Sequence, residues 1–244
     1  MSPTDVAGAV VETAEVRLRL DVSRSARAGL LTALTVEVNQ ACDRAEDAPD
    51  GPPVVVELAG TEPGDGPAGG WPAELAIAEV NRWERAVRRL ERLGAPIVAV
   101  AGGLCAGPAL DVLLAADHRI GTPGTRLALA REGDLLWPGM ALHRLVQQVG
   151  LARVRPLALL GRSLTAREAA ELGLLDQVTE DTGAAVSSVT AELSGLSGRA
   201  LAVQRRLLLE AVTTSHEEAI GVHLAACDRT LRRTHEAGPA EENR

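Results

Sequence analysis

The sequence predicts an α/β fold with a helical C-terminal region, and three observations lead to this class. Strand-like and helix-like segments alternate through the first part of the chain, helical patterns fill its end, and a glycine-rich turn joins a buried strand to a buried helix near the centre. The chain has 244 residues, of which 46% are apolar. A chain of this size can bury a core as one domain without disulfides or metal ions.

The first elements follow from periodicity. Residues 16–21 (VRLRLD) alternate apolar and polar side chains, as a half-buried strand does. Residues 26–47 carry apolar positions three to four apart, which predicts an amphipathic helix, and residues 54–58 form a short apolar strand. The segment 59–72 (AGTEPGDGPAGGWP) is rich in glycine and proline and predicts a loop. A loop this long inside a compact domain is usually functional or mobile.

The central run needs a choice between two structures. Helix is predicted over 73–93, and the run 97–116 that follows has Asp111 as its only charge, so its length also fits a membrane span. Glycines and a proline inside the run, and a charge near its middle, disfavour a spanning helix. We therefore expect a buried strand, a glycine-rich turn and a buried helix, and no membrane segment.

The later part of the chain predicts short elements and then helices. Strands are expected at 118–121 and 127–130, and helices at 137–148 and 152–160. A capping box follows in SLTARE, where Thr165 caps a helix and Glu168 reaches back. The expected organisation is a core, a C-terminal helical region and two flexible ends, at residues 16–182, 183–234, and 1–15 with 235–244, respectively.

Composition excludes several kinds of chemistry. The net charge of −8 argues against a nucleic-acid partner, which demands a basic surface. All 25 basic residues are arginine, and the chain has no Lys, Tyr or Phe, so a lysine Schiff base and a tyrosine acid are excluded. Three cysteines without metal-ligand spacing predict neither disulfides nor a zinc site, and together with a start that lacks a secretory pattern they indicate the cytoplasm.

Two glycine-rich turns are the candidate site. They are GPAGGW at 66–71 and GGLCAGPA at 102–109, and such turns either present backbone N–H groups to a developing oxyanion or allow close packing of strand against helix. Neither turn spells a dinucleotide or P-loop motif. The chain also lacks the nucleophile-elbow and zinc-protease patterns.

From residue 95 to 178 the sequence resembles the core of the crotonase (enoyl-CoA hydratase/isomerase) superfamily. The resemblance rests on AGGLCAGPALD, on DHRI from residue 117, on WPG at 137–139, and on GRSLTAREAAELGLLDQV. It implies a ClpP/crotonase-like spiral of ββα units over about residues 16–234. Within the superfamily, VNRWERAVRRLERLGAP and GPALD are most like the DpgB-type proteins of 3,5-dihydroxyphenylglycine biosynthesis.

The resemblance implies an acyl-CoA thioester whose carbonyl oxygen sits between two backbone N–H groups. One donor aligns with Ala68 or Gly69. The other aligns with Pro108, which has no N–H, so Gly107 or Ala109 is the candidate replacement. No metal and no cofactor other than the coenzyme A of the substrate is expected.

The acid/base pair of the superfamily is also altered. The first glutamate aligns with Asp111 and the second with Arg131, and Glu132 is displaced by one position. Asp111 is either a proton shuttle, with a pKa raised by apolar surroundings, or a helix-capping partner. Arg131 either forms a surface ion pair or binds a polyketone oxygen. Trp137 is a candidate wall of the acyl pocket or plain core.

The resemblance implies dehydration or isomerisation of a cyclised polyketide acyl-CoA, which aromatises to 3,5-dihydroxyphenylacetyl-CoA. The alternative is a non-catalytic acyl-CoA-binding scaffold, or an activator of a partner type III polyketide synthase. An ordinary hydratase of fatty-acid oxidation is disfavoured because it needs both carboxylates. The superfamily further implies a homotrimer or hexamer built through the C-terminal helices. Candidates for contact with a CoA phosphate, or simply solvated arginines, are Arg24, Arg205, Arg206, Arg232 and Arg233.

Overall fold

The fold is built on a five-stranded parallel sheet. The structure is a computed structural model that describes residues 16–21, 29–48, 52–59, 75–132, 134–196 and 198–236. The strand order is β1-β2-β3-β5-β10, and every neighbouring pair is parallel. These strands are β1 (Val16–Asp21), β2 (Val54–Ala59), β3 (Ile97–Gly102), β5 (His118–Gly121) and β10 (Gln177–Val178).

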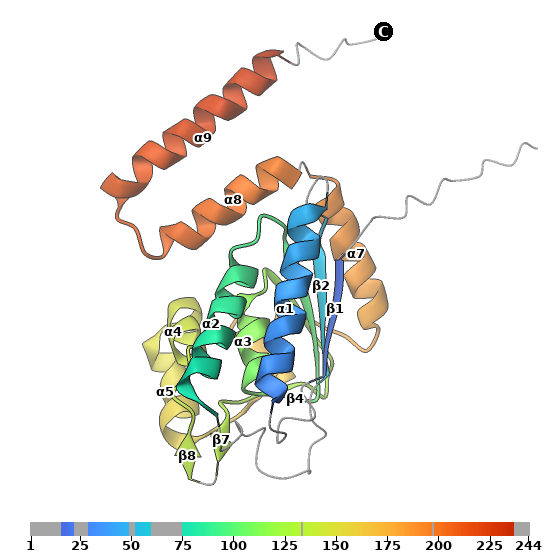
Figure 1. The fold of residues 1–244 in the computed structure, drawn as a ribbon, viewed down its shortest axis with the longest axis vertical. Coiled ribbons are helices and arrows are strands. Elements are labelled where there is room, and N and C mark those ends of the chain that lie inside the picture. Colours follow the sequence, from blue (N-terminus) through green and yellow to red (C-terminus); the bar gives the residue numbers. More distant parts are fainter. Residues whose placement is uncertain are drawn as a thin grey trace, which may run out of the picture.

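Helices cover both faces of this sheet (Figure 1). One face packs against α1 (Leu30–Asp47) and α3 (Pro108–Ala115), both of which contact α2 (Ile77–Glu91), and the other face packs against α7 (Thr182–Ser194). In β2, Val54 and Val56 belong to the main core, whereas Val55 packs with the residues that contact α7. Burial of both faces explains why β2 and β3 are nearly continuous apolar runs, whereas β1, at the edge of the sheet, alternates apolar and polar residues.

Short strands form two smaller sheets beside the large one. The first has the order β4-β6-β9, from Leu104–Cys105, Arg126–Leu127 and Leu164–Thr165; the second pairs β7 (Arg131–Glu132) with β8 (Leu135–Leu136). The chain passes from the large sheet to the small one at β3–β4 and at β5–β6, and returns through α6 (Ala166–Glu171) to β10. This alternation produces a spiral of ββα units, so the predicted fold class is confirmed.

The ambiguous run 97–116 forms β3, β4 and α3, as expected. No helix in the part of the chain that the structure describes has the length and apolar character needed to cross a membrane. The strand expected at 127–130 is reduced to the two-residue β6. Helix α4 (Ala141–Val149) begins later than expected, because the N–H of Trp137 is bonded to the carbonyl of Ala130 at 2.8 Å and holds the preceding residues extended.

The capping box at the start of α6 is confirmed. The N–H of Glu168 donates to Thr165 Oγ1 at 3.3 Å, and the N–H of Thr165 donates to Glu168 Oε2 at 2.8 Å. The preceding helix, α5 (Leu151–Leu160), ends at Gly161 in a left-handed conformation. Together these ends fix the short connection that carries β9.

The last two helices, α8 (Gly198–Ala211) and α9 (His216–Glu236), lie outside the layered core (Figure 1). Arg205 attaches α8 to the core: its Nε lies 2.6 Å from Asp117 Oδ2, and its Nη1 donates to the carbonyl of Leu93. Helix α7 falls in the range expected for the C-terminal region, yet it packs on the sheet, so α8 and α9 alone stand apart. Of the ends expected to be flexible, 1–15 and 235–244, residues 235 and 236 are the last residues of α9, and 1–15 and 237–244 lie outside the described residues.

Candidate functional site

Asp111 lies in the first turn of α3, where its carboxyl group is enclosed by two other helices. Its side chain is only 2% exposed. Trp83 of α2 donates from Nε1 to Asp111 Oδ2 at 3.0 Å, and Arg144 of α4 places Nη1 3.5 Å from Oδ1. The backbone N–H of Ala141, the first residue of α4, also bonds to the carboxyl. Helices α2, α3 and α4 therefore meet at the carboxyl group of Asp111.

Arg144 is buried and faces two further carboxylates. Its Nη1 lies 3.3 Å from Glu84 Oε2, and its Nε lies 3.9 Å from Glu91 Oε1. Glu91 has a second partner in Arg88, at 2.6 Å. We call Asp111, Glu84, Glu91 and Arg144 the carboxylate cluster. The sequence patterns revealed neither the contact of Trp83 with Asp111 nor the presence of Arg144 and Glu84 beside it.

The cluster changes the acidity of Asp111. Burial, and then the negative charge of Glu84, raise the pKa of Asp111 to about 7, against the lowering effect of the hydrogen bond from Trp83 and the charge of Arg144. A carboxyl group with a pKa near neutrality can both give and accept a proton at physiological pH. The chemistry available here is therefore proton transfer.

The first turn of α3, which includes Asp111, also contains backbone N–H donors. Gly107 has φ 54° and ψ −127°, a conformation that glycine adopts without strain, and Pro108 is the first helical residue. The N–H of Asp111 is already bonded to the carbonyl of Gly107 at 3.0 Å. Because Pro108 has no N–H, the donors of this turn that have no acceptor within the helix belong to Ala109 and Leu110.

The other predicted residues fall in different places. Ala68 and Gly69 lie in 60–74, outside the described residues, so the first oxyanion donor is not described, and the same holds for the side chain of Glu132. Arg131, on β7, is half-buried, and a Cβ built on Gly161 would lie 3.6 Å from its Nη1. Its guanidinium therefore lies beside the C-terminal end of α5, whereas the contacts of Asp111 come from α2 and α4.

Trp137 is half-buried and packs against the main core just before α4. Its indole lies directly over Gly139, where an added Cβ would come within 2.7 Å of Cδ1. This packing fixes the chain that leads to Ala141, whose N–H reaches Asp111. Trp137 therefore contributes to the site at least through the position of α4.

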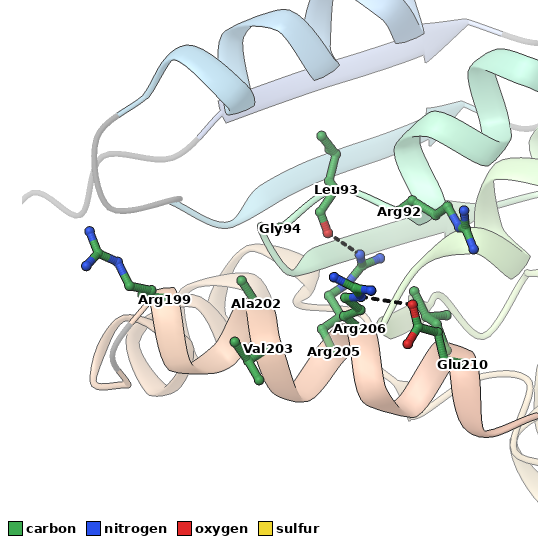
Figure 2. A pocket seen from close by; sticks show the side chains of 10 residues that line it. Arg92, Leu93, Gly94, Arg199, Ala202, Val203, Arg205, Arg206 and Glu210 are labelled. Atoms are coloured by element: carbon green, nitrogen blue, oxygen red, sulfur yellow. Dashed lines mark hydrogen bonds and ion pairs between the residues drawn. The ribbon is translucent and has the colours of Figure 1, made fainter. Parts of the chain in front are cut away.

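Two clefts are found away from Asp111. One, of about 500 Å³, lies between α8 and the end of α2 and is lined by Arg92, Leu93, Arg199, Arg205 and other residues (Figure 2). In it, Arg205 is bonded to Leu93 and Arg206 to Glu210, and Arg92 and Arg199 lie at opposite ends. Leu93 lies just before β3 and the Gly107 turn comes after the end of β3. This cleft therefore opens at the opposite end of the sheet from the first turn of α3.

The second cleft, of about 340 Å³, is lined by the ends of β2 and β3 and the start of α7. Its lining includes Ala59, from which the segment 60–74 continues.

Among the residues that the structure describes, there is no group of three or more His, Cys, Asp or Glu side chains able to hold a metal ion. Cys42, Cys105 and Cys227 are free thiols.

Comparison with known proteins identifies the family. No model of a protein family matches the sequence. A curated protein of Amycolatopsis orientalis described as enoyl-CoA-hydratase is 46% identical over 219 residues, which cover 90% of this chain and 97% of that protein. The chain belongs to the crotonase (enoyl-CoA hydratase/isomerase) superfamily.

Other relatives of the superfamily match a shorter part. The mevalonyl-coenzyme A hydratase of Beauveria bassiana is 33% identical over 119 residues, 47% of this chain and 42% of that protein. Among solved structures, enoyl-CoA hydratase from Bacillus anthracis aligns with a TM-score of 0.77 at 19% identity, covering 89% of this chain and 87% of that one. The enoyl-CoA hydratase of Mycobacterium smegmatis aligns with a TM-score of 0.76 at 18% identity, covering 90% and 88%. These structures establish the crotonase fold.

Proposed function

We propose that the chain binds an acyl-CoA thioester and promotes dehydration or enol isomerisation of a cyclised, polyketide-like acyl group, with 3,5-dihydroxyphenylacetyl-CoA as product. In this proposal the thioester oxygen lies between an N–H of Ala68 or Gly69 and an N–H of Gly107 or Ala109. Asp111 exchanges a proton with the acyl group. In its protonated form it protonates the departing hydroxyl, and as the carboxylate it removes the proton from carbon.

The observation that carries the proposal is the state of Asp111. In the sequence resemblance it aligns with the first glutamate of the superfamily; its carboxyl is enclosed by helices, and its pKa is raised to about 7. Aromatisation supplies driving force to the reaction, so that one proton-transferring carboxyl and a weakened oxyanion site suffice. The proposal gives Arg131 no proton-transfer step, because its guanidinium lies beside α5.

The test is the turnover of Asp111→Asn with the cognate cyclised thioester, followed by product formation. Loss of one general acid/base group is expected to lower turnover by about a hundredfold or more. Asp228→Asn is the matched control, because Asp228 is an exposed carboxylate paired only with Arg232 on α9 among the described residues. Turnover of Asp111→Asn equal to wild type would remove Asp111 from the mechanism.

A second candidate function is an acyl-CoA-binding scaffold or an activator of a partner type III polyketide synthase. Two observations favour it: Pro108 cannot donate the usual N–H, and the carboxyl of Asp111 already has donors from Trp83, Arg144 and Ala141. Incubating the isolated chain with crotonyl-CoA and then with the product of the synthase separates the two. Conversion of neither compound, together with a faster synthase in the presence of the chain, would support the activator.

We also propose assembly into a homotrimer or hexamer through α8 and α9. Large apolar side chains remain exposed on both helices, among them Leu208 on α8 and Ile220 and Leu224 on α9, and Val212 is exposed just after α8. Burial of such a surface in a second copy of the chain would stabilise these two helices, which stand apart from the core.

A further inference from the structure

The carboxylate cluster holds more negative than positive charge in a buried place. Glu91 is balanced by Arg88, which lies 2.6 Å away and is partly exposed. Asp111 and Glu84 are then left with one guanidinium, because the same Nη1 of Arg144 lies 3.5 Å from one and 3.3 Å from the other. Two carboxylates that share a buried cation cannot both remain ionised without a large electrostatic cost.

Glu84 carries a second sign of this imbalance. Its side chain is 18% exposed, but its Oε1 is buried and has no hydrogen-bond partner among the described residues. A buried carboxylate oxygen without a donor is unfavourable, and this cost falls when the cluster retains a proton. The geometry therefore favours a proton on Asp111, the more deeply buried of the two carboxyl groups, at neutral pH.

We propose that Glu84 is a positioning residue for Asp111. Both side chains contact the guanidinium of Arg144, and through this shared contact Glu84 keeps Asp111 able to carry a proton at neutral pH. The inference rests on the proposed function, because it explains how one carboxyl serves as donor and acceptor. In this chain the second carboxylate comes from α2. The superfamily position of the second glutamate, here Arg131, supplies none.

The groups that face Asp111 from each neighbouring element agree with this assignment. Helix α2 presents Glu84, Glu91 and Arg88, and α4 presents Arg144. From β4, the thiol of Cys105 is buried and neutral, with its pKa raised to about 12. Glu84 is thus the carboxylate that shares an Arg144 nitrogen with Asp111, whereas Glu91 contacts a different nitrogen and has its own cation.

The experiment follows the proton without substrate. Trp83 donates its indole N–H to Asp111, so protonation of Asp111 changes its surroundings and its fluorescence. Tryptophan fluorescence of the full chain is titrated between about pH 5 and 9, on either side of the raised pKa. A transition near neutral pH is expected in the wild type and should be absent in Asp111→Asn.

Glu84→Gln is expected to move the midpoint of this transition down by about one pH unit or more, a tenfold weaker hold on the proton, with an equal shift in the acidic limb of the pH–rate profile. Glu91→Gln is the matched control and should move it clearly less. Glu84→Asp keeps a carboxylate and should bring the midpoint part of the way back to the wild-type value. Circular dichroism of each variant checks that it is folded.

A midpoint unchanged in Glu84→Gln, an equal shift in Glu91→Gln, or no Asp111-dependent transition in the wild type would overturn the inference. The titration also separates this inference from the proposed function. If the titration behaves as expected and no thioester is converted, the role of Glu84 stands and the proposed reaction fails. If turnover depends on Asp111 but Glu84→Gln alters neither the midpoint nor the pH–rate profile, the reaction stands and the role of Glu84 fails.

Discussion

At the scale of single residues, the location of Asp111 sets its chemistry. A carboxyl group loses hydration when three helices enclose it, and here the donors Trp83 and Arg144 replace only part of that hydration. The negative charge of Glu84 further disfavours ionisation of Asp111 and so raises its pKa. The result is a weak acid in a chain that has no lysine or tyrosine to take its place.

This acidity predicts how stability depends on pH. The carboxyl of Asp111 ionises near pH 3.8 when unperturbed and near pH 7 in the fold. Between these values the folded chain binds more protons than the unfolded chain, so the contribution of Asp111 to the free energy of unfolding falls as pH rises. Asp111→Asn has no carboxyl group at this position, so its free energy of unfolding does not include this pH-dependent fall. Its unfolding free energy relative to wild type should therefore rise with pH through this window, by at most about 1.4 kcal/mol per pH unit.

Urea unfolding at several pH values measures this difference. The variant Asp228→Asn is the control, because it removes a carboxylate that is exposed on α9 and lies outside the carboxylate cluster. A difference between Asp111→Asn and wild type that does not change between pH 4 and 7 would contradict the raised pKa of Asp111.

At the scale of elements, the start of α4 depends on one glycine. An added Cβ at Gly139 would lie 2.7 Å from Trp137 Cδ1 and 2.8 Å from Nε1, and the rigid indole packs against the core. Gly139→Ala is expected to lower the free energy of unfolding by about 1–3 kcal/mol, because the ring or the backbone must move. Thermal unfolding measures it, with Gly221→Ala in α9 as control.

At Gly221 an added Cβ meets nothing within 4 Å, so alanine there should leave stability unchanged or raise it through its helix propensity. Equal stability of Gly139→Ala and wild type would show that Trp137 is free to move away. Gly139→Ala should also shift α4 and its contact from Ala141 to Asp111, and so weaken turnover if the proposed function holds.

Elements such as α4 also show how far the sequence could lead. The run 97–116, the Thr165 capping box and the position of Asp111 could be predicted because each signal lies within a few residues. The partners of Asp111 could not, because Trp83 and Arg144 are 28 and 33 residues away and reach it only through helix packing. Two-residue strands such as β4 and β7 are too short to show an alternating pattern of apolar and polar residues, and only hydrogen-bonded pairing with another strand defines them.

At the scale of the whole molecule, α9 is a helix with little to cover it. Ala226 is its buried residue among those described, while Ile220, Leu224 and Leu231 are 46–61% exposed. Their spacing of four and seven residues places them on one face of the helix. An apolar stripe on a helix that stands apart from the core predicts contact with a second copy of the chain, in line with the proposed assembly.

The substitution Leu224→Asp in this stripe tests the assembly. Because a buried carboxylate without a partner is unfavourable, the variant should lower the molar mass of the assembly measured by light scattering at micromolar concentration, with the core still folded by circular dichroism. Arg229→Asp, on another face of α9, makes a larger change in charge and should leave the molar mass at the wild-type value. A wild-type chain that is monomeric at the same concentration, or equal masses for wild type and Leu224→Asp, would mean that α9 does not hold copies of this chain together.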